Sequence, residues 1–182
     1  CEAVVEALRQ HLAVTKVAGL ACAAMTNLAI HDNNRKALIQ AGACDIVVAA
    51  LQQHVLNAHV AEQACSAIGN FTAGDEDNAE VALAHAGACE AVVAALQQHV
   101  AVAKVALRAC GAIADLAADD DKQATLARLG ACEAVVAALR QHMADADTTE
   151  AGCVAIWSLS NNNDDNSLLL SRAGVCDAIV GA

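Results

Sequence analysis

A pattern of small apolar and polar positions recurs along this chain at a nearly constant interval. The clearest copies are GACEAVVAALQQHV at 87–100 and GACEAVVAALRQHM at 130–143, and looser copies occupy 42–55, 1–12 and 174–182. A fixed period in this size range is typical of a helical solenoid, whose stacked repeats share one continuous core. The first cysteines of the copies are separated by 43, 45, 43 and 44 residues, at Cys1, Cys44, Cys89, Cys132 and Cys176.

Each repeat is predicted to contain three helices, and the second repeat serves as the example. A short helix spans 33–40, and Gly42 suits the left-handed backbone that turns the chain sharply after it. A second helix spans 44–54, and a longer third helix spans 59–72 and ends at Gly74-Asp75. The chain is thus expected to be one solenoid over 1–182, with a partial repeat at 1–31, repeats at 32–74, 75–118 and 119–163, and a partial repeat at 164–182.

Composition and charge narrow the choice of partner. The chain is 57% hydrophobic but only 1% aromatic, and it lacks proline, which fits a mostly helical chain of small side chains. The net charge of −11 argues against nucleic acid or anionic lipid as a partner, because both require a positive surface. It favours a basic partner, or it serves only to keep the protein soluble. No apolar run approaches the roughly 20 residues of a membrane span.

Nine cysteines form two columns, one opening the second helix of each repeat and one within the third. The odd number and the helical repeat indicate reduced thiols in a cytoplasmic or nuclear protein. No CxxC pair is present, so we expect the thiols to pack as small hydrophobic groups and to bind no metal. Histidines close the second helices at His11, His54, His99 and His142, where they complement the helix dipole.

The segments NRKALIQAGACDIVVAAL (34–51) and ACSAIGNFTAG (64–74) resemble the armadillo repeat family. The resemblance implies an all-α fold: an armadillo-type right-handed alpha-solenoid of three-helix repeats. It also implies a binding groove along the third helices, where an Asn in each repeat clamps the backbone of an extended peptide. That column reads Asn27, Asn70, Asp115 and Ser158 here, so the amide is present in two of the four positions.

Other third-helix residues complete the predicted groove. Peptide-binding armadillo proteins of the importin-alpha kind carry a Trp four residues before the Asn. Those positions here are Ala23, Ser66, Gly111 and Val154, so the aromatic array is absent, which argues against recognition of a nuclear localisation signal. Trp157 is either an interface anchor or a filler between the last two third helices. An Asn amide can also bond to a neighbouring helix instead of a peptide. The remaining groove candidates are Ser66, Glu62 and Glu150.

The sequence therefore predicts a protein-binding module that holds an extended peptide or a helix, with a basic partner favoured. No nucleophile, base and orienting group recur together, so we expect no enzyme activity and no cofactor. One alternative is a structural or engineered, consensus-like scaffold without a dedicated ligand, given the near-identity of 88–101 and 131–144. Another is self-association through exposed terminal repeats, because the helix pair in 1–29 is expected to lack a polar outer face. The polar runs 119–121 and 161–166 are expected to be solvated turns that supply helix N-caps.

Overall fold

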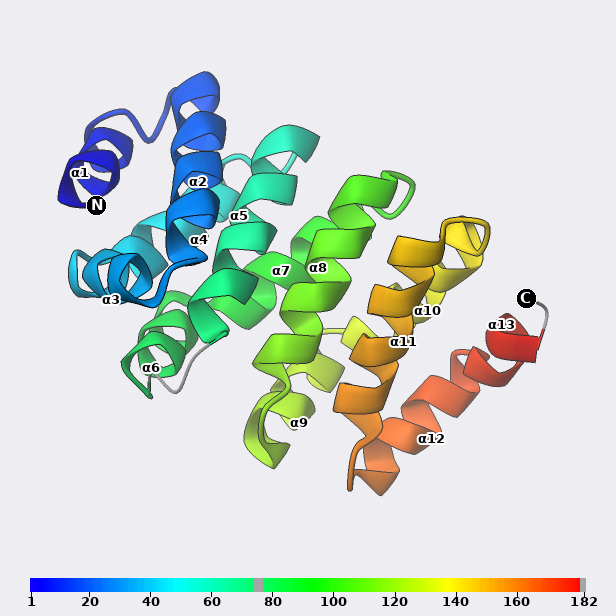
Figure 1. The fold of residues 1–182 in the computed structure, drawn as a ribbon. Coiled ribbons are helices and arrows are strands. Elements are labelled where there is room, and N and C mark those ends of the chain that lie inside the picture. Colours follow the sequence, from blue (N-terminus) through cyan, green and yellow to red (C-terminus); the bar gives the residue numbers. More distant parts are fainter. Residues whose placement is uncertain (74–76, 181–182) are drawn as a thin grey trace.

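The computed structural model describes residues 1–73 and 77–180, and the described chain is helical throughout, without strands (Figure 1). The predicted third-helix end at Gly74-Asp75 lies outside the described residues. The helices are α1 (Glu2–Gln10), α2 (Thr15–Ala29), α3 (Asp32–Gln40), α4 (Ala43–Gln53), α5 (Ala58–Thr72), α6 (Asp77–Ala86), α7 (Ala88–Gln98), α8 (Ala103–Leu116), α9 (Asp120–Arg128), α10 (Ala131–His142), α11 (Ala146–Ser160), α12 (Asp164–Arg172) and α13 (Val175–Val180).

The predicted three-helix unit is confirmed. Helices α3, α4 and α5 contain 9, 11 and 15 residues, and α9, α10 and α11 repeat this order with 9, 12 and 15. Figure 1 shows α2, α5, α8 and α11 side by side in one row, with α4, α7 and α10 behind them and the short α3, α6, α9 and α12 along one edge. The result is an all-α solenoid in which the long helices form a continuous layer.

Glycine sets the turn between the short helix and the second helix. Gly42, the N-cap of α4, has a φ of 81°, in the left-handed region that a side chain disfavours. The corresponding turn before α10 uses Gly130, with a φ of 86°. The prediction for Gly42 is therefore confirmed, and the same backbone solution recurs along the solenoid.

The core is built from Ala, Val, Leu and Cys. Cys22, Cys65 and Cys110 are fully buried, and burial raises the pKa of each thiol to about 12. All nine cysteines are free, and three of them are exposed: Cys1, Cys153 and Cys176. A buried neutral thiol is a small apolar group, so the six buried cysteines contribute to the packing of the core, and the three exposed ones do not.

The histidine column links successive repeats. His54 Nε2 lies 2.6 Å from the backbone oxygen of Leu12, and His99 Nε2 lies 2.6 Å from that of Val55. His142 Nε2 makes the same contact with Val100 O at 2.7 Å. Since a carbonyl only accepts, the ring nitrogen donates in each case. Each of these three histidines therefore bonds its own second helix to the linker of the preceding repeat.

A second set of hydrogen bonds runs in the opposite direction. Two residues before each histidine, a Gln or Arg donates to a backbone oxygen at the end of the next short helix. Gln97 Nε2 donates to Leu129 O at 3.3 Å, and Arg140 Nη2 donates to Gly174 O at 3.0 Å. Helices α4, α7 and α10 are thus each bonded to both neighbouring repeats, which couples the stack along its length.

Two expectations from the sequence are wrong. Asn166, in the run expected to be a solvated turn, is only 2% exposed and donates from its amide to Leu159 O at 2.9 Å. The same run does supply the predicted N-cap, because Asn163 accepts from Asn166 N. The outer face of α1 is polar, because Glu6, Arg9 and Gln10 are exposed there. Helical periodicity places Glu6 and Gln10 on the side opposite the buried Val5 and Leu8, and it places Arg9 on the flank next to Val5.

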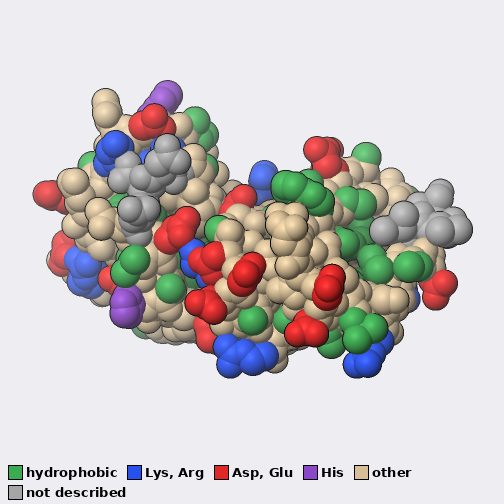
Figure 2. All heavy atoms as spheres, turned by 90° about the horizontal axis from the view of Figure 1, so that it is seen from below, with side chains coloured by type: hydrophobic (Ala, Val, Ile, Leu, Met, Phe, Trp, Pro, Cys, Tyr) green, Lys and Arg blue, Asp and Glu red, His purple; other side chains and the backbone are tan. Residues whose placement is uncertain are grey.

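The edge formed by the short helices is acidic. Carboxylates lie in the first turns of α3, α9 and α12, where they complement the positive end of the helix dipole. Figure 2, which views the molecule from this side, shows Asp and Glu side chains gathered over the middle of the face.

No single helix among the described residues is long and apolar enough to span a membrane. Only α6 and α7 taken together, across a 62° bend, reach the necessary length and hydropathy.

Candidate binding groove

The exposed side of α8 forms the floor of the candidate groove. Lys104, Leu107, Arg108, Gly111 and Asp115 follow the helical spacing i, i+3, i+4, i+7 and i+11, so they share one face. Two adjoining recesses of about 340 and 440 Å³ open over this face and share Leu107, Arg108 and Asp147. We call their combined surface, which receives side chains from α5, α8 and α11, the groove.

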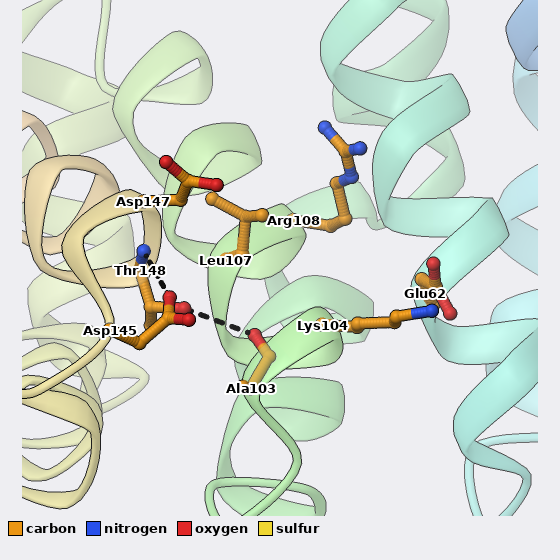
Figure 3. Close-up of a pocket in the computed structure, with 8 residues that line it drawn as sticks. All are labelled: Glu62, Ala103, Lys104, Leu107, Arg108, Asp145, Asp147 and Thr148. Atoms are coloured by element: carbon orange, nitrogen blue, oxygen red, sulfur yellow. Dashed lines mark hydrogen bonds between the residues drawn. The ribbon is translucent and has the colours of Figure 1, made fainter.

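Three of the predicted site residues meet in the groove. Glu62 projects into the first recess from α5 (Figure 3). Asp115 and Glu150 line the second recess, from α8 and α11 respectively. The other predicted residues lie on the same row of helices but do not line these two recesses: Asn27, Ser66, Asn70, Trp157 and Ser158.

Asn70 has an internal partner. Its side-chain amide donates to the backbone oxygen of Thr26 on α2 at 2.9 Å. The single hydroxyl hydrogen of Thr26 can be donated either to Cys22 O on its own helix at 3.0 Å or to Gln63 O on α5 at 3.2 Å. The Asn70 bond joins α5 to α2 within the row. One amide hydrogen of Asn70 is therefore engaged by the neighbouring helix. Asn27 is exposed, and its side chain forms no hydrogen bond with the described residues.

Asp115 occupies the position on α8 that Asn70 occupies on α5. Its Oδ2 lies 3.1 Å from where a Cβ on Gly69 would stand, so the carboxylate fills the space above that glycine. A carboxylate cannot donate to the adjacent backbone as the amide of Asn70 does. Loss of hydration against the neighbouring helix raises the pKa of Asp115 although part of the side chain is exposed.

Trp157 lies at the surface of α11. Its side chain is 66% exposed, and Val154, one turn earlier on the same helix, is 44% exposed. Trp157 therefore does not fill a space between α8 and α11. Ser158, the last member of the Asn column, is half-buried, and its backbone oxygen accepts from Gln123 Nε2 at 3.0 Å.

Sequence reasoning missed the positive charges of the groove. Lys104 and Arg108 are exposed on α8, and neither forms an ion pair with a described residue. In Figure 3 the Lys104 side chain extends toward Glu62, while Leu107 separates Arg108 from Asp147. The i, i+4 spacing of Lys104 and Arg108, in register with Asp115, was the signal in the sequence. Within the described part of the chain, no three His, Cys, Asp or Glu side chains converge to hold a metal ion.

These features define a helical repeat protein whose long helices stand side by side in one continuous row. Residues 31–73, which contain α3 to α5, match the family model of the Armadillo/beta-catenin-like repeat. The resemblance to the armadillo repeat family is thereby confirmed, and the all-helical stack is that of an armadillo-type solenoid. No curated protein matched the chain. An armadillo repeat indicates a protein-interaction or scaffold module.

Proposed function

We propose that this chain binds an extended segment of another protein along the row formed by α2, α5, α8 and α11, with the groove as the main contact. The observation that carries the proposal is the recess over α8, which is lined from three successive third helices and contains charged groups without internal ion pairs. Charged groups that already stand in a recess can pair with a ligand at little cost in reorganisation.

Basic side chains of the partner would meet Glu62, Asp115 and Glu150. These carboxylates are spread over three neighbouring helices, so a segment lying across the row can contact each in turn. The overall charge of −11 adds a long-range attraction for a basic segment. The same charge supports the view that the partner is neither nucleic acid nor an anionic membrane.

Backbone recognition would come from the Asn column. Asn27 offers a donor and an acceptor that no described residue occupies, and these match the C=O and N–H groups of a peptide. Asn70 uses one amide hydrogen to bond Thr26 O, so its amide oxygen and its second amide hydrogen remain for a peptide backbone. The loss of affinity expected for Asn27→Ala is about 1–3 kcal/mol, the value of one or two hydrogen bonds. Asn70→Ala is expected to weaken binding by a similar amount, but it also breaks the bond to α2, so its stability must be measured in parallel.

The test is a binding titration of a labelled basic peptide against wild type, Glu150→Gln and Glu133→Gln. Glu150 lines the groove, whereas Glu133 is equally charged and exposed on α10, in the layer behind. We expect Glu150→Gln to weaken binding about two- to fivefold at low salt, the size of one exposed ion pair. Glu133→Gln is expected to have almost no effect. Equal effects of the two variants would show that only net charge matters and would refute groove binding.

A second proposal is self-association, favoured by large apolar side chains exposed on the outer helices of the row. Leu20 on α2 is 58% exposed and Trp157 on α11 is 66% exposed. Light scattering over a concentration series should show a mass that rises with concentration and falls back in Trp157→Ser. A monomer at all concentrations contradicts this proposal.

We also propose a reducing cytoplasmic or nuclear location, which the nine free thiols support.

A further inference from the structure

The charges in the groove change sign from helix to helix. Glu62 on α5 is negative, Lys104 and Arg108 on α8 are positive, and Asp147 and Glu150 on α11 are negative. Carboxylates stand on the outer two helices, and the cations Lys104 and Arg108 stand between them on α8. The groove-lining carboxylate of α8, Asp115, lies two turns beyond Arg108 on the same helix. A segment that crosses α8 at Arg108 therefore meets negative, positive and negative charge in that order.

The central cations are not neutralised within the protein. Neither Lys104 nor Arg108 forms an ion pair with any described residue, although carboxylates line the same recesses. Figure 3 shows Lys104 extending toward Glu62 and Arg108 directed away from both Glu62 and Asp147. Arg108 is thus the cation most available to a ligand. A uniformly basic segment would place a positive side chain against it and would be repelled there.

We propose that the partner segment is extended and carries one acidic side chain between two basic ones, in the order Lys/Arg-x-x-Asp/Glu-x-x-Lys/Arg. The acidic side chain pairs with Arg108, and the basic side chains pair with Glu62 on one side and with Asp147 or Glu150 on the other. This inference rests on the proposed function and adds the charge order and spacing of the partner.

The spacing of three residues follows from two lengths. Packed neighbouring helices lie about 8–10 Å apart. A chain in the polyproline II conformation advances about 3.1 Å per residue and completes a turn in three residues, so side chains three apart point the same way at about 9 Å. In a β-strand, side chains on one face are about 7 or 14 Å apart, and neither spacing matches adjacent helices. An extended polyproline II segment is therefore the conformation that fits the row.

The experiment compares three peptides of equal length with neutral spacers. The first has the basic-x-x-acidic-x-x-basic order, the second has the same composition with the acidic residue at one end, and the third has three basic residues. We expect the first to bind the wild-type chain about fivefold more tightly than the second, because only the first pairs all three charges. It should also bind more tightly than the third, despite its lower positive charge.

Charge reversal at the centre tests the assignment of Arg108. Arg108→Glu should reverse the preference, so that the third peptide binds more tightly than the first. Arg128→Glu is the control, since it makes the same change of net charge on α9, at an exposed residue outside the groove. Arg108 makes no internal hydrogen bond or ion pair with a described residue, so folding of the variant should be unaffected, which circular dichroism checks.

The outcomes separate the two proposals. If the third peptide binds as tightly as the first, and Glu150→Gln weakens both, then groove binding holds and the charge order is refuted. If Arg128→Glu changes the preference as much as Arg108→Glu does, then net charge explains the result and the charge order is also refuted. If no peptide binds, or if none responds to groove substitutions, then the proposed function fails and the charge order fails with it.

Discussion

Replacement of His99 by Ala tests whether the histidine column couples successive repeats. His99 Nε2 donates to Val55 O at 2.6 Å, across the boundary between α7 and the linker before α5. The histidine is half-buried, so water replaces the lost donor only in part. A hydrogen bond of this kind contributes about 0.5–1.5 kcal/mol net. With the packing of the ring added, His99→Ala should lower the free energy of unfolding by about 1–2 kcal/mol.

His11 provides a matched control. Both histidines are the C-caps of their helices with almost the same backbone, at φ −121° and ψ 27° for His11 and φ −119° and ψ 27° for His99. The side chain of His11 is exposed and has no hydrogen bond to a described residue. Any effect of the substitution on helix propensity or on the helix dipole is therefore common to both variants. We expect His11→Ala to change stability by less than about 0.5 kcal/mol.

Urea unfolding followed by far-UV circular dichroism measures both variants under the same conditions. His99→Gln should lose less stability than His99→Ala, because the amide keeps a donor near the Val55 carbonyl. If His11→Ala and His99→Ala lose equal stability, the histidines act only on their own helices and the cross-repeat bond contributes nothing. If neither variant loses stability, hydration replaces the bond fully, and the coupling inferred from the geometry is refuted.

Three further predictions concern the ionisation of Asp115, two glycines and the thiols. The raised pKa of Asp115 means that the folded chain binds this proton more readily than the unfolded chain, so its ionisation destabilises the fold above that pKa. Asp115→Asn should then be more stable than wild type at neutral pH, with a difference that shrinks as the pH falls through the raised pKa; a difference independent of pH contradicts this. Gly130→Ala should destabilise by about 1–2 kcal/mol because the φ of Gly130 is 86°. Gly111→Ala, at a helical position where an added Cβ meets nothing within 4 Å, should instead stabilise by up to about 1 kcal/mol; thermal unfolding of both variants checks the opposite signs. An aromatic disulfide reagent should titrate three thiols quickly in the native protein and six more only after unfolding, and fast reaction of a fourth would contradict the burial; the three are Cys1, Cys153 and Cys176.

The sequence alone predicted the repeat, the order of its helices and the class of protein. These features follow from local rules: a period of about 43–45 residues, small apolar positions within each helix, and a glycine where the backbone must become left-handed. Gly42 agrees with the prediction for that reason, and the bounds of α3, α4 and α5 agree with it to within one residue. The sequence also predicted the groove carboxylates Glu62, Asp115 and Glu150, since helical spacing assigns each residue to one face of its helix.

The tertiary structure decided what each face meets. The sequence shows Asn70 and Asn27 as equivalent members of one column, but among the described residues only Asn70 finds a hydrogen-bond partner, Thr26 O on α2. Asn166 looked like part of a polar turn, yet the packing of α12 against α9 and α11 encloses it. The cross-repeat bonds of His99 and the position of Arg108 between two acidic helices likewise depend on how one repeat is placed on the next. That placement comes from contacts between residues more than thirty positions apart, which a local pattern does not encode.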